Sequence, residues 1–238
     1  KEFPPPPPDD RASSKLDALI EEAPGQSLDL VVCLDTTESM KPYIDDLKKN
    51  LGPILRARVS RFASFRIGIV LFKDYWPDEY ITRKYPFTSD IAAFERTMKG
   101  VWVAGGKDIP EAEHEALFSA AAEFDWNADR RQIILVTDAP PHPEPHGKLL
   151  FADVLRELKG KHIEADAIIE PTTISPPNPM PRAFEKEAKR LVTLVAGGSK
   201  IKLLTFPGSE YSAELAAANL GDIETVSSAN ALDAATDD

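Results

Sequence analysis

The fold is decided by the stretch Leu28-Asp-Leu-Val-Val-Cys-Leu-Asp-Thr-Thr-Glu-Ser39, in which a nearly all-apolar run ends in polar residues. Such a run, rich in Val and Leu, predicts a strand covered on both faces, as in a parallel sheet. We expect this strand to end at Asp35. Pro42 fits the first turn of a helix that begins near Lys41, and Ser39 stands where an N-cap residue would. The stretch therefore predicts a strand followed by a helix.

The rest of the chain repeats this alternation of apolar runs and helical patterns. Further strands are expected at residues 66–75, 80–87, 132–137, 163–169 and 201–205. Further helices are expected at residues 91–98, 111–124, 149–159, 182–195 and 213–220. The first helix should kink or break at Gly52-Pro53. We predict an α/β fold of the doubly wound, Rossmann-like type: a mostly parallel sheet, one antiparallel edge strand at 80–87, and helices on both faces.

The termini differ in composition from the centre of the chain. Pro4 to Pro8 indicate that residues 1–27 form a stiff, extended linker or tether, with the domain at 28–221 and a flexible acidic tail at 222–238. A proline-rich tether suits a module held away from a membrane, so we favour a location outside the cytoplasm over a cytoplasmic one. The same run is alternatively a ligand for an aromatic-lined groove. Residues 171–181 are proline-rich and are expected to form a loop.

Charge and composition exclude several classes of protein. The net charge of −11 and the pI of about 4.9 argue against binding to nucleic acid, because phosphates would be repelled. No apolar stretch is long enough to span a bilayer. The single cysteine, Cys33, lies inside an apolar run and is expected in the core. The oligomeric state does not follow from the sequence.

Three loops carry oxygen ligands where predicted strands end. Asp35, Thr37 and Ser39 follow the first strand, Asp108 follows a double glycine, and Asp138 ends the strand at 132–137. Loops after parallel strands converge at one edge of such a sheet. Carboxylates and hydroxyls without nitrogen or thiolate ligands favour Mg²⁺, or else Mn²⁺ or Ca²⁺, over zinc. The alternative is that these side chains cap turns and helices.

The pattern Asp35-x-Thr37-x-Ser39 resembles the metal-ion-dependent adhesion site of von Willebrand factor type A domains. The motifs at 105–111 (Gly-Gly-x-Asp-x-Pro-Glu) and 137–142 (Thr-Asp-Ala-Pro-Pro-His) are similar to those of a subgroup found in bacterial proteins, hemicentin-type matrix proteins and beside some α-kinase domains. The resemblance covers about 28–220. It implies that Thr37 and Ser39 coordinate the cation directly, and Asp35 and Asp138 directly or through water. An acidic residue of a protein partner would complete the coordination.

Asp108 departs from the family pattern, which usually has a threonine at this position. The extra negative charge should strengthen cation binding but weaken the attraction of a partner's carboxylate. Asp108 therefore favours retention of the cation over adhesion through a partner's acidic residue.

We interpret the chain as a metal-dependent protein-binding module, for adhesion or assembly, and not as an enzyme. The alternatives are a metal-dependent hydrolase or phosphatase that uses the same carboxylates, and a metal-free scaffold. Motifs of the G-x-S-x-G and P-loop types are missing. A phosphatase of the D-x-D type would lack its general acid, because Thr37 replaces the second aspartate.

Other polar residues near these loops have simpler interpretations. Glu38 and Glu111 are expected to serve helix dipoles. His142 and His146 are expected on a solvated loop rim, because the prolines around them prevent the helical spacing of a metal site.

Overall fold

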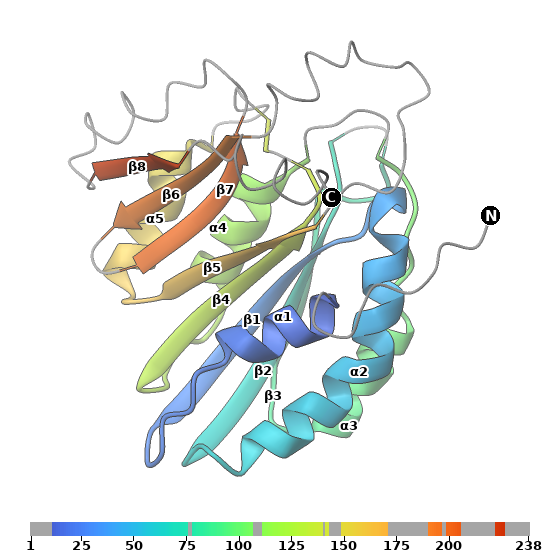
Figure 1. Cartoon of the computed structure of the whole chain (residues 1–238), viewed down its shortest axis with the longest axis vertical. Coiled ribbons are helices and arrows are strands. Elements are labelled where there is room, and N and C mark those ends of the chain that lie inside the picture. Colours follow the sequence, from blue (N-terminus) through green and yellow to red (C-terminus); the bar gives the residue numbers. More distant parts are fainter. Residues whose placement is uncertain are drawn as a thin grey trace, which may run out of the picture.

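The computed structural model describes residues 11–75, 78–106, 111–139, 141–142, 149–170, 190–196, 199–205 and 222–226. A five-stranded sheet in the order β3-β2-β1-β4-β5 forms its centre (Figure 1). Its strands are β1 (Ser27–Asp35), β2 (Ser64–Phe72), β3 (Thr82–Thr88), β4 (Arg130–Thr137) and β5 (Glu164–Ile169). Only the pairing of β2 with β3 is antiparallel among these neighbours, so the predicted mixed sheet with an antiparallel edge is confirmed.

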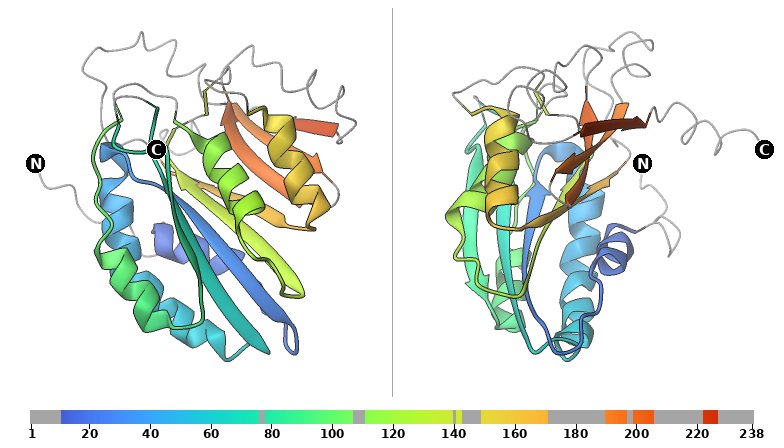
Figure 2. Two further views of the ribbon diagram at one scale, coloured as in Figure 1. Left: turned by 180° about the vertical axis from the view of Figure 1, so that it is seen from behind. Right: turned by 90° about the vertical axis from the view of Figure 1, so that its left-hand side faces the viewer.

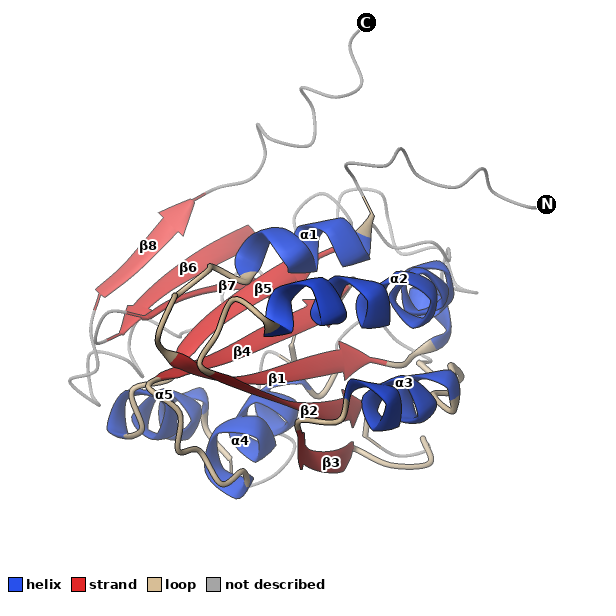
Figure 3. Ribbon diagram, turned by 90° about the horizontal axis from the view of Figure 1, so that it is seen from below, coloured by secondary structure: helices blue, strands red, loops and turns tan. Residues whose placement is uncertain are grey.

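Helices cover both faces of this sheet (Figure 3). They are α1 (Ala12–Leu19), α2 (Lys41–Val59), α3 (Ile91–Lys99), α4 (Glu113–Glu123) and α5 (Phe151–Gly160). Successive side chains of a strand point to opposite faces. In β1, Leu30, Val32 and Leu34 accordingly belong to the core under α1, α2 and α3, whereas Val31 and Cys33 belong to the core under α4 and α5. The doubly wound architecture is thus confirmed.

The start of α2 agrees with the sequence prediction, but one detail differs. Pro42 lies in the first turn, as expected, and a 3-10 turn (Glu38–Met40) precedes the helix. Ser39 does not cap α2, since no side chain caps its N-terminus. Pro53 lies inside the helix without breaking it, and α2 bends along its length (Figure 1). A proline kinks a helix whose flanking turns stay packed on a core, as these do.

Two corrections concern the termini. The linker prediction is wrong for residues 12–19, which form α1. Ala12, Leu16 and Ile20 are buried against the core shared with α2, because their spacing of four gives α1 an apolar stripe. The segment predicted as a flexible tail from residue 222 begins with the strand β8 (Asp222–Val226).

A second sheet has the antiparallel order β7-β6-β8 and lies beyond β5, on the side away from β3 (Figure 2). It includes β6 (Arg190–Ala196) and β7 (Ser199–Thr205), and β7 lies beside β5. The strand predicted at 201–205 is confirmed. The helix predicted at 182–195 is wrong for residues 190–195, whose pairing with β7 and β8 makes them a strand. Its first half, the loop at 171–181 and the helix at 213–220 lie outside the described residues.

Within the described ranges, no helix has both the length and the apolar character that a membrane span requires.

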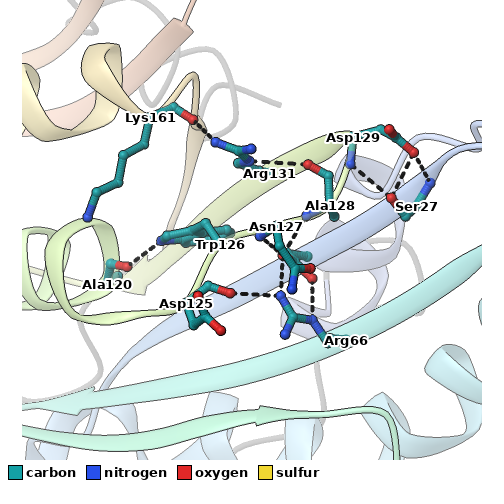
Figure 4. Close-up of polar contacts among 11 residues, drawn as sticks. Ser27, Arg66, Ala120, Asp125, Trp126, Asn127, Ala128, Asp129, Arg131 and Lys161 are labelled. Carbon is teal, nitrogen blue, oxygen red and sulfur yellow. Dashed lines mark hydrogen bonds and ion pairs between the residues drawn. The ribbon is translucent and has the colours of Figure 1, made fainter.

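A polar network links the amino-terminal ends of neighbouring strands in this sheet (Figure 4). Asp29 of β1 is 1% exposed, and its carboxylate accepts two hydrogen bonds from the Arg66 guanidinium, at 2.6 and 2.7 Å. The backbone N–H groups of Asn127 and Ala128 donate to the same carboxylate, at 2.9 and 3.0 Å. The network thereby joins β1, β2 and the loop before β4.

We expect Asp29→Ala to lower the free energy of unfolding by about 3 kcal/mol, since it leaves a guanidinium and two backbone donors without their acceptor. Urea unfolding followed by circular dichroism measures this. The control is Asp45→Ala, which removes an exposed i,i+4 partner of Lys41 and should change stability by less than about 0.5 kcal/mol. Equal effects of the two substitutions would show that the network adds nothing.

Candidate functional site

Asp35 lies at the carboxyl end of β1 and is completely buried. Its Oδ1 accepts hydrogen bonds from the backbone N–H and the hydroxyl of Thr37, at 2.9 and 2.7 Å. Its Oδ2 accepts a bond from the Thr137 hydroxyl of β4, at 3.0 Å. Burial, together with the charge of Asp138, raises the pKa of Asp35 to about 7. The carboxyl group therefore joins two neighbouring strand ends.

The loops after β1 and β4 meet through a second contact. The Ser39 hydroxyl donates to Oδ1 of Asp138 at 2.9 Å and lies 3.4 Å from the Thr37 hydroxyl. Asp35, Thr37, Ser39 and Asp138 thus lie together at one edge of the sheet, as the spacing predicted. Asp108 lies outside the described residues. The role of all five as metal ligands stays a prediction.

The loop before residue 107 packs directly on these residues. Gly105 and Gly106 have φ angles of 89° and 72°, which other residues rarely adopt. A Cβ on Gly106 would lie 2.8 Å from Cβ of Thr37 and 3.1 Å from Oε1 of Glu111. The Gly105 carbonyl accepts a hydrogen bond from the backbone N–H of Glu38, at 3.3 Å. The double glycine therefore allows the backbone to approach the site closely.

Lys73, which follows β2, fixes two of the site loops. Its ammonium donates to the carbonyl of Thr36 at 2.9 Å and to the carbonyl of Ala104, and the residue is 2% exposed. Burial lowers the pKa of Lys73, and nearby carboxylates, Asp78 first, oppose this effect. The lysine thus holds the loops after β1 and before residue 107 together and brings a positive charge to the edge of the site.

Two glutamates near the start of α4 add to the buried acidic groups. Glu111 is 3% exposed and Glu113 is 0% exposed. Burial raises the pKa of each well above its usual range, with Asp35 and Asp138 among the causes that raise it further. Within the described part of the chain, Oε2 of Glu111 and both carboxylate oxygens of Glu113 have no hydrogen-bond partner. The prediction that Glu111 serves a helix dipole is wrong, because Glu111 precedes the N-cap of α4 and does not lie in its first turn.

His142 is also buried, contrary to the prediction of a solvated rim, whereas His146 lies outside the described residues. Nε2 of His142 lies 2.6 Å from Oδ1 of Asp74, and its ring packs edge-on against Tyr75 at 5.1 Å. The Tyr75 hydroxyl donates to Glu115 of α4. This polar network ties the loop after β4 to the loop after β2 and to α4, so it supports the shape of the site.

The donors at this edge fit a divalent cation. In the ranges that the structure describes, no cluster of three or more His, Cys, Asp or Glu residues could hold a metal by itself. A cation would therefore need the hydroxyls of Thr37 and Ser39 as well as carboxylates, a set of hard oxygen donors that suits Mg²⁺, Mn²⁺ or Ca²⁺. The raised pKa values of the buried carboxyl groups also indicate that too little positive charge lies near them. A bound cation would supply that charge.

Comparison with known proteins identifies one family. The model of the von Willebrand factor A domain matches residues 29–174, more than half of the chain. A putative ariadne-like RING finger protein of Acanthamoeba polyphaga mimivirus is 29% identical over 133 residues. That match covers 56% of this chain and 13% of the relative, so the chain spans only a small part of the relative's length.

Among solved structures, the pilus adhesin SpaC of Lactobacillus rhamnosus GG gives a TM-score of 0.44 at 12% identity, covering 62% of this chain and 24% of the adhesin. An aerotolerance-related membrane protein of Bacteroides fragilis gives 0.41 at 17% identity, covering 87% of this chain and 96% of that one. A proximal thread matrix protein of the mussel byssus gives 0.45 at 16% identity, covering 60% of this chain and 35% of that one.

The stability of the cation-free chain should fall as the pH rises. Because Asp35, Glu111 and Glu113 have raised pKa values in the folded chain, their contribution is present below about pH 4 and is lost as the pH rises, which for Asp35 occurs up to about pH 7. In chelator, we expect a melting temperature at least about 5 °C lower at about pH 8 than at about pH 5, since one pKa unit is worth about 1.4 kcal/mol.

Scanning calorimetry measures this difference, and Asp35→Asn, which removes one of these titrations, should reduce it. Asp29, whose pKa is lowered, affects stability only below this pH window. A melting temperature equal or higher at about pH 8 would contradict the prediction.

Gly106→Ala should destabilise the chain by roughly 1–3 kcal/mol more than Gly25→Ala does. Gly25 has a similar φ of 81°, but a Cβ there meets no atom within 4 Å, so it measures backbone strain alone. The extra loss at Gly106 comes from displacing Thr37 and Glu111. Urea unfolding compares the two variants, and equal losses would mean that the loop does not press on Thr37.

Proposed function

This chain belongs to the von Willebrand factor A domain family, and from that premise we propose that it is a protein-binding module whose partner docks at a divalent cation. Domains of this family generally mediate protein interactions. The observation that carries the proposal is the 2.9 Å contact of Ser39 with Asp138 beside the buried Asp35, which joins the loops of two parallel strands. Ligands of doubly wound sheets bind at such strand ends.

The proposed ligand set consists of side chains from three loops. Thr37 and Ser39 would hold the cation through their hydroxyls, and Asp35, Asp108 and Asp138 through carboxylates, directly or by way of water. The cation, which we propose to be Mg²⁺ with Mn²⁺ or Ca²⁺ as alternatives, would offer an open coordination position to an acidic residue of the partner. Lys73 and the double glycine position the loops that carry these ligands.

The charge around the proposed cation affects how the partner binds. Asp35, Glu111, Glu113 and Asp138 are all buried, and the neighbouring Lys73 is engaged with two backbone carbonyls. With a divalent cation bound, the net charge of these groups would be close to zero or negative. Cation retention should therefore be strong, and the pull on a partner's carboxylate weak. We infer that the partner gains most of its affinity from contacts around the cation.

We expect calorimetric titration with Mg²⁺, Mn²⁺ and Ca²⁺ to detect binding to the chain, and Asp35→Asn to weaken it by more than about 100-fold, above the effect of residues that only orient ligands. The matched control is Asp45→Asn, which removes an exposed carboxylate on α2 and should leave cation affinity within about twofold. Circular dichroism checks that each variant is folded.

Absence of cation binding to the unmodified chain would overturn the proposed metal site and leave the metal-free scaffold. Hydrolysis of generic phosphate esters that disappears in Asp35→Asn would favour the hydrolase instead. A pull-down with and without chelator then tests the partner, whose capture should depend on the cation and on Asp35.

A further inference from the structure

Glu113, the first residue of α4, has an environment that neither the helix nor the core explains. Its side chain is 0% exposed, and within the described residues neither carboxylate oxygen accepts a hydrogen bond. A buried carboxyl group without partners costs several kcal/mol unless a charge or a donor compensates it. An apolar residue would fill this position without that cost, so packing of the core does not explain why a glutamate lies here.

A role for Glu113 at the helix dipole does not provide that reason. A glutamate that serves a helix N-terminus accepts a hydrogen bond from a free backbone N–H or faces solvent near it. The carboxylate of Glu113 does neither, and no side chain caps the start of α4. The helix dipole therefore does not explain why both carboxylate oxygens of Glu113 are buried.

The surroundings of Glu113 point toward the carboxyl edge of the sheet. Helix α4 packs on the face of β1 to which Val31 and Cys33 contribute, and Asp35 continues that face. At the start of this helix, the backbone N–H of Ala112 donates to the carbonyl of Lys73 at 3.1 Å, and Glu111 pairs with Pro141 in an isolated β-bridge. Glu113 therefore lies beside the loops that follow β2 and β4, next to the residues that join the ends of β1 and β4.

We propose that Glu113 is a further carboxylate of the divalent cation site, reaching it from the helix side and not from the three loops. This inference rests on the proposed function. A divalent cation beside Asp35 and Asp138 would compensate the buried charge of Glu113, and Glu113 in turn would strengthen cation binding. The ligand is a cation of the Mg²⁺ and Mn²⁺ class. Glu113 acts through a bridging water, since no three carboxylates of the described residues are placed to hold a metal together.

The test is Mn²⁺ titration of the full chain by calorimetry, with Glu113→Gln as the variant. We expect Glu113→Gln to weaken Mn²⁺ binding by about 10- to 100-fold. The matched control is Glu123→Gln, which removes the same charge from the last residue of the same helix, where the side chain is half exposed and pairs with Lys84. Its affinity should stay within about twofold of the unmodified chain.

Thermal unfolding in chelator provides a second readout. Without a cation, Glu113→Gln should melt at the same or a higher temperature than the unmodified chain, because the amide cannot ionise and so removes an uncompensated buried charge. Added Mn²⁺ should then stabilise the unmodified chain more than the variant. Should Glu113→Gln fail to fold, Glu113→Asp keeps the charge but withdraws it by one methylene, and it should still weaken Mn²⁺ binding by more than Glu123→Gln.

The outcomes separate this inference from the proposal beneath it. Mn²⁺ binding to the unmodified chain with unchanged affinity in Glu113→Gln would overturn the role of Glu113 and leave the loop site intact. No Mn²⁺ binding to the unmodified chain would overturn both.

Discussion

The buried carboxyl group of Asp35 is the constraint on which the carboxyl edge of the sheet depends. It accepts hydrogen bonds but cannot donate them when ionised, so its neighbours must bring donors to it. Thr37 brings two, and Thr137 of β4 brings a third. The adjacent Thr36 donates its hydroxyl to the carbonyl of Phe72 in β2 and accepts from Lys73. Three strand ends are thereby held around one buried acid.

Strands that are buried on both faces were predictable from the sequence. The apolar runs of β1 and β4 have no polar face, and this pattern alone indicates strands covered by helices on both sides. The segment at 190–196 was not predictable in the same way, because a short run such as Leu191-Val-Thr-Leu-Val195 fits a helix or a strand equally. Its antiparallel partners β7 and β8 decide the matter. The pair Gly197-Gly198 between this run and the next is a local hairpin signal, whereas the pairing with the more distant β8 leaves none.

The site could be predicted only in part. The sheet topology predicts that four side chains lie close together, because neighbouring parallel strands end at the same edge of the sheet. These are Asp35, Thr37, Ser39 and Asp138. Glu113 could not be found, since a buried glutamate at the start of a helix has the same sequence signature as an exposed one. Lys73 does carry a sequence signal. Like Asp35, it is a charged residue directly after a buried apolar strand.

The two buried aspartates of β1 support the proposed cation at this edge. Asp29 and Asp35 lie on the same face of one strand, and burial alone raises the pKa of both. At Asp29, Arg66 and two backbone N–H groups outweigh burial, so the net pKa is lowered. At Asp35, three hydrogen bonds do not outweigh burial and the charge of Asp138, and the pKa stays raised at about 7. The same chain thus neutralises a buried acid with arginine at one end of the strand and surrounds the other with further acids. An edge built only for stability would have used the first solution twice, and the second becomes favourable when a divalent cation replaces the missing positive charge.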